Sequence, residues 1–277
     1  MNKDGATVVR RQLGRRMKSL REDAGKTMTQ VQEAKYASTT KLWRMESGLV
    51  PVKVGDVLAL ARLYGADSAT TDHLVAMAEA STRPGWWQDY EVDMPVDFQF
   101  FLGLESSAPR ISSYESEFVP GLLQTADYSL AHARATLLTP QTQEEIQAAL
   151  AFRLERQRQV FGRSEAPLVT VLLNAAVLAR VVGDAQVMIN QREHLLRLSK
   201  RKRVEIRVLP WDVGAHRAMF GAFKLFEFDD PATDPAVVYH ELIGGGLYLE
   251  KPFQITRYRA ALDSALHQSV PLTEYLS

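Results

Sequence analysis

The sequence predicts an α+β protein, with an all-α domain of five helices at residues 1–80 and a larger mixed α/β domain at residues 81–277. Three observations predict this division. Residues 7–80 carry short apolar repeats of helical period that end at glycines. A cluster of loop-forming residues follows at 81–85. Beyond it, helical stretches alternate with β-rich runs, as in mixed α/β domains.

Composition sets limits on the class of protein. The 277 residues are 46% apolar and include no cysteine, which excludes disulfides, thiolate metal sites and cysteine nucleophiles. No apolar run is long enough to span a bilayer, and the basic start of the chain lacks the apolar stretch of a secretion signal. We therefore expect a cytoplasmic, nucleoid-associated protein that has no membrane contact.

Charge is unevenly divided although the formal net charge is zero. Residues 1–64 contain 13 Lys and Arg against 6 Asp and Glu. Subtraction from the totals of 33 and 33 leaves 20 basic against 27 acidic residues for the rest of the chain. A basic first domain on an acidic second domain indicates a surface for a polyanion on the first domain.

The first two helices are predicted at residues 7–24 and from residue 28 to residue 34 or 35. The first has an apolar stripe and a strongly basic opposite side, and Gly25 ends it. Thr27 and Gln30 have the spacing of a capping box, which places the start of the second helix near Met28. A tight turn at residues 35–38 follows.

A third helix after this turn is the element around which the domain is organised. Ser38 caps its start and Gly48 ends it. Leu42 and Met45 share one face and are expected to be buried, whereas Thr39, Thr40, Lys41 and Arg44 point elsewhere. Two short helices joined by about four residues match the helix-turn-helix pattern, in which the second helix enters the major groove of DNA. An ordinary amphipathic surface helix is the alternative for this stretch alone.

Two more helices complete the first domain. A loop at residues 51–56 leads into the fourth helix, which Gly65 closes, and residues 67–80 form the fifth, capped by Ser68 or Thr71. In the second domain we expect helices at 97–117, 122–137, 142–161, 184–199 and 252–267. Strands are expected at 167–173, 204–208, 222–228 and 236–241, and a glycine turn at 244–246 leads into a hairpin strand at 247–250.

Position within the helix-turn-helix assigns the candidate DNA contacts. Residues at the start of the third helix face base edges, so Thr39, Thr40, Lys41 and Arg44 are the candidate base contacts. Thr29 and Gln30 at the start of the second helix, and Lys53 on the loop after the third, are the candidate phosphate contacts. We expect Trp43 to pack into the core, the alternative being a position against the sugar-phosphate chain. Glu46 is expected to pair with an arginine of the first helix.

The sequence resembles two regions of known regulators. Residues 7–65, with Lys41-Leu42-Trp43-Arg44-Met45-Glu46 and Pro51-Val52-Lys53, resemble the XRE-type helix-turn-helix of phage-repressor-like proteins. Val119-Pro120-Gly121-Leu122-Leu123-Gln124-Thr125 with Tyr128, and Val238-Tyr239-His240-Glu241, resemble the C-terminal domain of WhiJ-like, actinobacterial transcription factors. Two positions depart from the pattern, since Tyr36-Ala37 replaces the usual turn glycine and Asn174 replaces an acidic residue.

The predicted function is that of a sequence-specific transcriptional regulator that binds double-stranded DNA as a homodimer. Its second domain receives a signal from a small-molecule effector or a small partner protein. Trp86 and Trp87, or Arg153 and Arg156, are weaker candidates for this ligand or partner contact. The resemblance also implies an alternative, an antitoxin-like protein that mainly binds a small acidic partner protein and autoregulates its operon.

An enzyme is the third hypothesis, and the sequence disfavours it. We expect no cofactor, no metal and no catalytic residue. There is no phosphate-binding loop and no nucleophile elbow, and no histidine pair has metal-ligand spacing. His216, His240 and Glu241 form the best acid–base candidate, although a loop and a strand edge explain them more simply.

Overall fold

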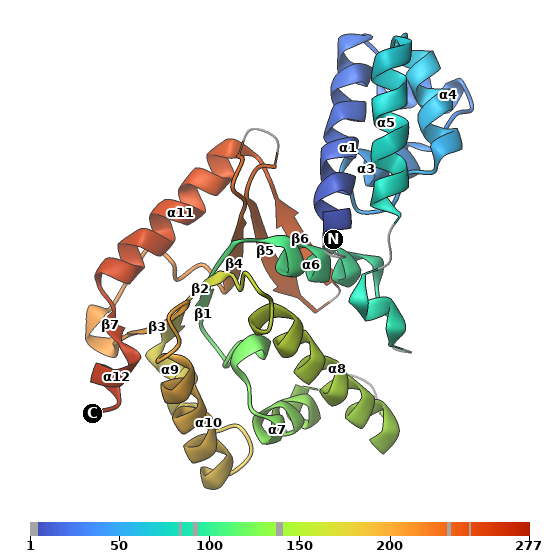
Figure 1. The fold of residues 1–277 in the computed structure, drawn as a ribbon. Coiled ribbons are helices and arrows are strands. Elements are labelled where there is room, and N and C mark those ends of the chain that lie inside the picture. The colour runs from blue at the N-terminus through green and yellow to red at the C-terminus, as the bar shows by residue number, and fades with distance from the viewer. Residues whose placement is uncertain (1–4, 83–84, 91–93, 137–140, 232–233, 244) are drawn as a thin grey trace. The chain divides into compact units, whose positions relative to one another are not determined.

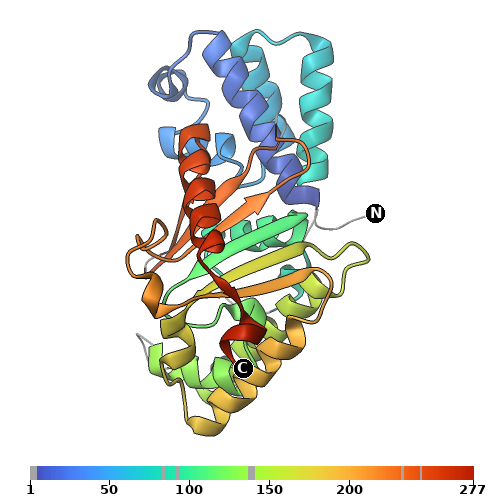
Figure 2. The same ribbon diagram turned by 90° about the vertical axis from the view of Figure 1, so that its left-hand side faces the viewer.

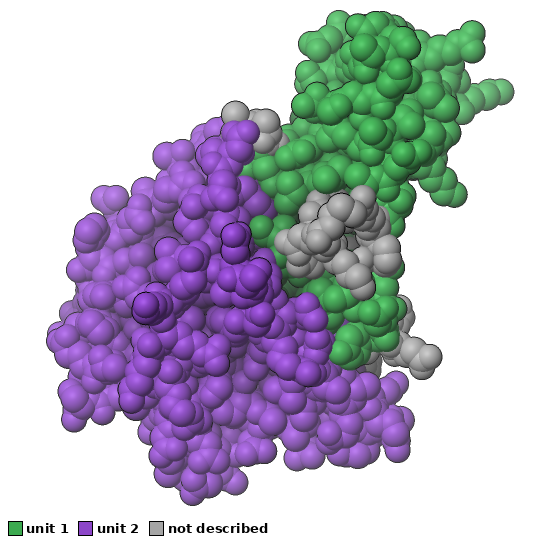
Figure 3. All heavy atoms as spheres, viewed as in Figure 1, with its two compact units in different colours: residues 1–107, 232–234 green, residues 108–231, 235–277 purple. Residues whose placement is uncertain are grey.

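The computed structural model describes residues 5–82, 85–90, 94–136, 141–231, 234–243 and 245–277. The chain forms two compact units, coloured separately in Figure 3. The first contains residues 1–107 with 232–234, and the second contains residues 108–231 with 235–277. Among the described residues of the first unit all regular structure is helical, and the second unit contains a mixed sheet, which confirms the predicted fold class.

All five helices predicted for the first domain are present (Figure 1). They are α1 (Gly5–Asp23), α2 (Met28–Glu33), α3 (Thr39–Glu46), α4 (Val54–Tyr64) and α5 (Ser68–Ser81). Gly25, Gly48 and Gly65, which were predicted to end helices, all have positive φ, from 65° to 75°. The predicted cap of α5 is wrong, because the Asp67 carboxylate accepts the hydrogen bond from the Thr70 backbone N–H at 2.7 Å.

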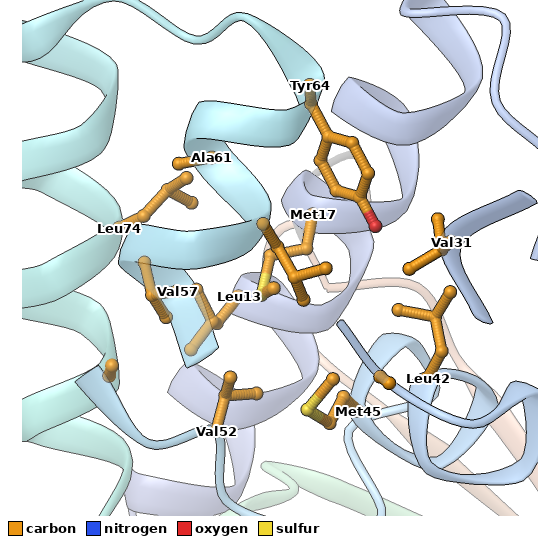
Figure 4. Packing of buried hydrophobic residues seen from close by; sticks show 13 residues of the cluster. Leu13, Met17, Val31, Leu42, Met45, Val52, Val57, Ala61, Tyr64 and Leu74 are labelled. Atoms are coloured by element: carbon orange, nitrogen blue, oxygen red, sulfur yellow. The ribbon is translucent and has the colours of Figure 1, made fainter. Parts of the chain in front are cut away.

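One apolar core holds these five helices together (Figure 4). Leu13 and Met17 of α1 lie at its centre, and Leu42 and Met45 of α3 pack beside them. All four side chains are at most 2% exposed. Residues from α2, α4, α5, the turn before α3 and the loop before α4 complete the core: Val31, Ala37, Val52, Val57, Leu60, Ala61, Tyr64, Leu74 and Ala78. The helical apolar period of the sequence therefore produces the expected buried stripe.

The first unit extends beyond the boundary predicted after residue 80. It includes a 3-10 turn, η1 (Trp86–Asp89), and α6 (Val96–Ser107). Helix α6 packs against α1 so closely that a Cβ on Gly103 would collide with the side chain of Thr7. Residues 1–4 and 83–84, where the sequence predicts the start of the chain and part of the boundary loop, lie outside the described residues.

The second unit is built on a seven-stranded mixed sheet in the order β6-β5-β4-β1-β2-β3-β7. Its strands are β1 (Arg110–Glu115), β2 (Leu168–Asn174), β3 (Val204–Leu209), β4 (Phe223–Glu227), β5 (Val237–Leu242), β6 (Gly245–Leu249) and β7 (Val270–Pro271). Strands β1, β2 and β3 are parallel, and the other neighbouring pairs are antiparallel. The predicted hairpin is the β5–β6 pair, although Gly244 of its turn lies outside the described residues.

Helices cover this sheet on both sides (Figures 1 and 2). They are α7 (Ala126–Thr136), α8 (Gln143–Phe161), α9 (Ala175–Ala179), α10 (Ala185–Leu198), α11 (Pro252–His267) and α12 (Leu272–Tyr275), with 3-10 turns η2 (Gly121–Leu123) and η3 (Trp211–Val213). Helix α11 buries Ile255 and Leu262 against Tyr114, Leu225 and Val238 of the sheet. Helix α8 lies on the other side of the sheet from α11 (Figure 1). Among the described residues, no helix combines the length and hydropathy that crossing a bilayer requires.

Several expectations for the second domain are wrong in detail. Residues 97–117 were predicted as one helix, but α6 ends at Ser107 and residues 110–115 form β1, at the centre of the sheet. Residues 122–137 contain η2 before α7, and Leu137 lies outside the described residues. The short elements α9, β7 and α12 were not predicted. Strand pairing explains the first error, because β1 hydrogen-bonds to β2 and β4, which lie far away in the sequence.

Candidate nucleic-acid interface

Side-chain caps fix the starts of α2 and α3, the two helices of the helix-turn-helix. The Thr27 hydroxyl accepts from the Gln30 backbone N–H at 3.2 Å, and the Gln30 side-chain oxygen accepts from the Thr27 N–H at 2.9 Å. The Ser38 hydroxyl caps α3 by accepting from the Lys41 N–H at 3.2 Å. These bonds satisfy N–H groups that have no partner inside the helices. Both predicted caps are therefore confirmed.

Lys35, in the turn between α2 and α3, adopts the left-handed backbone conformation that favours glycine. Lys35 has a φ of 61° and is the one non-glycine residue with positive φ in the described part of the chain. The backbone N–H of Tyr36 bonds to the carbonyl of Val31 at 3.3 Å, which closes the end of α2. The left-handed conformation costs a non-glycine residue about 1–2 kcal/mol. The turn between α2 and α3 thus closes without a glycine.

Gly14 allows α3 to approach α1 closely. A Cβ at this position would lie 2.5 Å from the carbonyl oxygen of Met45 and 2.6 Å from that of Glu46. Such distances are shorter than van der Waals contact, so any side chain would push the two helices apart. The last turn of α3 therefore lies directly on the backbone of α1, which sets the position of the whole of α3.

A buried ion pair joins the same two helices. The Arg21 Nε donates to Glu46 Oε1 at 2.6 Å, and the Arg21 Nη2 donates to Oε2 at 2.9 Å. The two side chains are only 7% and 2% exposed. The hydrogen bonds to Glu46 raise the pKa of Arg21, and burial together with the Glu46 charge raises the pKa of the neighbouring Tyr64 to about 12. The predicted pairing of Glu46 with an arginine of the first helix is confirmed.

Part of the basic surplus of the first domain is neutralised inside the unit. Arg11 is fully buried, and its Nη1 lies 2.6 Å from the carboxylate of Asp234. Arg15 also lies within 3.2 Å of this carboxylate. Arg10 donates to the carbonyl of Ser81 at the end of α5, at 3.2 Å. These arginines stabilise the fold, so the surface available to a polyanion is less basic than the count of charges indicates.

The predicted base-contact residues lie on the solvent side of α3. Thr40, Lys41 and Arg44 are exposed, and Thr39 is half-buried. The backbone N–H of Thr39 donates to the side-chain oxygen of Gln32 at 3.0 Å, which ties the start of α3 to α2. Thr40, Lys41 and Arg44 therefore lie on the side of α3 away from the core, whereas Thr39 lies at the edge of its buried side.

Lys41 is held by a residue that the sequence did not single out. Its Nζ donates to Asp56 Oδ1 at 2.8 Å, and the two side chains are 48% and 23% exposed. Asp56 lies in the first turn of α4. A carboxylate at this place orients the lysine and also reduces the positive charge of the surface.

The predicted phosphate-contact residues are also on the surface. Thr29, Gln30 and Lys53 are all exposed. The Gln30 side-chain oxygen is bonded within the α2 cap, which leaves its amide nitrogen as the donor for a phosphate. Lys53 immediately precedes α4, and its side chain makes no cap hydrogen bond.

The expectation that Trp43 packs into the core is wrong. Its indole is 51% exposed, on the same helix as Arg44 and Lys41. Tyr36 in the preceding turn is 38% exposed. Leu42 and Met45 already fill the buried side of this eight-residue helix, so the indole between them has to point outward. Helical spacing from Leu42 and Met45 could have given this result.

Trp86 and Trp87, the candidate ligand residues, are both buried at 7% exposure. Their rings meet edge to face with centroids 5.9 Å apart, and the Trp86 Nε1 donates to the Ser106 hydroxyl at 3.1 Å. This arrangement is that of core packing in the first unit, against α6. Their role in ligand or partner binding stays a prediction.

Arg153 and Arg156 lie near the Pro-Gly-Leu-Leu-Gln-Thr segment of the second unit. The Arg153 Nη1 donates to the Gln124 side-chain oxygen at 2.5 Å. The amide of Gln124 in turn donates to the Val119 carbonyl at 2.7 Å, and Gln157 donates to the carbonyl of Gly121 at 2.8 Å. Burial and the nearby Arg156 lower the pKa of Arg153 to about 10. The segment is therefore a hydrogen-bonded junction between η2 and α8.

His216 and His240, the histidines of the candidate acid–base cluster, contact two different tyrosines. His216 Nε2 lies 3.4 Å from the Tyr114 hydroxyl, whereas His240 Nε2 lies 2.8 Å from the Tyr258 hydroxyl. Within the described residues, no three His, Cys, Asp or Glu side chains gather as a metal site would require. Asn174, the departure from the acidic pattern, caps α9 and donates to the Tyr114 hydroxyl at 3.3 Å.

Two family models match the chain. Residues 12–74 match a helix-turn-helix domain, and residues 98–274 match a domain of unknown function, DUF5753. The first match contains α2, α3 and α4, and the second contains the whole seven-stranded sheet. No curated protein and no solved structure was found to be similar to the chain.

Proposed function

The chain belongs to the family defined by the domain of unknown function DUF5753, and from this premise we propose that it is a sequence-specific, DNA-binding transcriptional regulator whose second domain receives a signal. The helix-turn-helix domain at residues 12–74 supports the DNA-binding part of the proposal. The larger second domain supports the regulatory part, because a helix-turn-helix domain does not need a second domain of this size to bind DNA.

The amphipathic character of α3, buried on one side and exposed on the other, is the observation that carries this proposal. Leu42 and Met45 are 0% and 1% exposed, whereas Thr40, Lys41 and Arg44 are exposed on the other side. A short helix anchored in this way can place polar side chains against base edges in a major groove. Arginine and lysine bind the acceptors of guanine, and the methyl group of threonine contacts the methyl group of thymine.

The neighbouring residues supply the sequence-independent contacts in this proposal. Thr29, Gln30 and Lys53 bind phosphates on either side of α3. Trp43 lies against the sugar-phosphate chain, which its half-exposed indole supports. A single helix of this length reads only one half-site, so we propose that the protein acts as a homodimer on a two-fold symmetric operator.

Operator affinity tests the proposal. The operator is first found by mapping the bound DNA genome-wide. The variants Lys41→Ala and Arg44→Ala are then expected to weaken operator binding by about 1–3 kcal/mol each, the value of one good base contact. Their affinity for a random duplex should change much less. Wild-type binding should also fall steeply with salt, because counterions are released from the phosphates.

Arg197→Ala is the matched control. Arg197 is 64% exposed on α10 of the second unit, and its loss changes the net charge by the same amount. Operator affinity should therefore stay at the wild-type value in this variant. Equal effects of Arg44→Ala and Arg197→Ala would show that α3 does not read the operator, and the proposal would fail.

A further inference from the structure

The function proposed above does not say which part of the second unit receives the signal, and a groove in this unit is a candidate. It lies between α11 and the loop that leads into β4, and it has a volume of about 570 Å³. Small-molecule sites in proteins usually measure about 300–1,000 Å³. Phe220, Phe223 and Phe253 supply three aromatic rings to its walls. The groove thus has the size and the apolar lining of a ligand site.

Two of these rings are unusually exposed. Phe220 is 92% exposed and Phe253 is 58% exposed, whereas Phe223 at the base of the groove is only 3% exposed. Large apolar side chains that gather beside a concave surface mark a place where apolar surface binds. An apolar part of a ligand could cover both exposed rings while it rests on Phe223.

The charged side chains of the groove are all of one sign. Arg217 and Arg257 line it, and no carboxylate is found among its described lining residues. The guanidinium carbon of Arg257 lies 6.0 Å from the centre of the Phe253 ring, which places a cation beside one of the exposed aromatic rings. A ligand that complements this surface has an apolar part and a negative charge at one end.

We propose that this groove binds a small amphipathic organic anion, with its apolar part on the phenylalanine rings and its carboxylate at Arg217 and Arg257. The inference deepens the proposed function, because it gives the chemical class of the signal that the second domain receives. Arginine suits this role because its planar guanidinium donates two parallel hydrogen bonds to a carboxylate.

Calorimetric titration of the full chain without DNA tests the site. The probes are decanoate, decanol and acetate, which separate the contribution of the charge from that of the apolar chain. Decanoate should bind at least ten-fold more tightly than either decanol or acetate. Arg257→Ala should weaken decanoate binding at least ten-fold and leave decanol binding unchanged. Arg217→Ala should act in the same direction.

Two further variants make the result specific to the groove. Ala260 is an exposed residue of its lining, so Ala260→Trp should fill the groove and abolish decanoate binding without loss of the fold. Arg259→Ala is the control, since Arg259 lies on the same helix but pairs with Glu227 at 2.6 Å. It should bind decanoate as the wild type does. The far-ultraviolet circular dichroism of each variant checks that α11 is intact.

Decanoate that binds Ala260→Trp as tightly as the wild type would overturn the proposal, and so would equal affinity for decanoate and decanol. If decanoate fails to bind and Ala260→Trp instead breaks a dimer in sedimentation, the groove is an interface between copies and the proposal is wrong. Because these titrations contain no DNA, their failure leaves the operator experiment unaffected. Failure of the operator experiment likewise leaves the binding result standing.

Discussion

Removal of Glu46 should strongly destabilise the helix-turn-helix, because it breaks the buried ion pair between α1 and α3. The Glu46→Ala variant leaves the guanidinium of Arg21 buried, at 7% exposure, without the two hydrogen bonds of 2.6 and 2.9 Å. Loss of one partner from such a pair costs about 3–5 kcal/mol. That is a large part of the roughly 5–15 kcal/mol that stabilises a typical domain.

The double variant Arg21→Met with Glu46→Leu should recover much of this loss. It removes both charges, so neither side chain remains buried without its partner. The losses of unfolding free energy in the single variants Arg21→Met and Glu46→Leu should therefore sum to more than the loss in the double variant. The difference should exceed about 1 kcal/mol, as is expected for residues in direct contact. This difference separates the ion pair from a general effect of smaller side chains.

Hydrogen exchange measured by mass spectrometry is the appropriate assay, because it reports α1 and α3 separately from the second unit in the full chain. Glu22→Ala is the control, since Glu22 is 56% exposed and its oxygen lies 3.9 Å from Lys18 and 3.6 Å from Arg21, so that it meets Arg21 from the solvent side only. It should cost less than about 1 kcal/mol. A Glu46→Ala effect as small as that of the control would refute the conclusion that the pair anchors α3.

Three further predictions concern the same domain. Because burial raises the pKa of Tyr64 from 10.0 to about 12, the folded state keeps its proton more tightly than the unfolded state. The contribution of Tyr64 to stability is thus complete below pH 10 and is lost as the pH rises towards 12; Tyr64→Phe should remove this slope from alkaline denaturation curves. Gly14→Ala should lower the melting temperature, since its Cβ would lie 2.5 Å from the carbonyl oxygen of Met45, and an unchanged melting curve would contradict the close approach of α1 and α3. Asp56→Asn, which frees Lys41, should tighten binding to a random duplex by about 0.5 kcal/mol and reduce the preference for the operator, as gel-shift titrations at two salt concentrations can measure.

Local interactions made most of the first domain predictable. Thr27 and Gln30, and Ser38 and the N–H of Lys41, are each three residues apart, so their caps depend on little beyond the nearby backbone. Thr142, the first residue of the helix predicted at 142–161, caps α8 in the same way, since its hydroxyl accepts from the Glu145 N–H at 3.2 Å. Helical spacing likewise predicted that Leu42 and Met45 are buried.

Helix faces in the second domain were less predictable. In α8 the apolar residues Ile146, Leu150, Leu154 and Phe161 have the spacing of one helix side, but the buried residues are Ile146, Phe152, Arg156 and Val160. In α10 the apolar residues Leu195 and Leu198 are buried, whereas Val187 is only half-buried and Ile189 is 46% exposed. Both helices also bury polar side chains, Arg156 and Gln191, which apolar periodicity does not detect.

What the sequence by itself determined is therefore the ends of the helices around the turn in the first domain, the buried side of α3 and the choice of candidate DNA-contact residues. Only the tertiary structure decided that residues 110–115 form the central strand, that Asp56 holds Lys41, and that Asp234 pairs with Arg11. Caps and helix faces depend on residues three or four positions apart, which the sequence displays directly. Strand pairing and buried ion pairs join residues that are 15 to more than 200 positions apart, and their free energy appears only when the chain has folded.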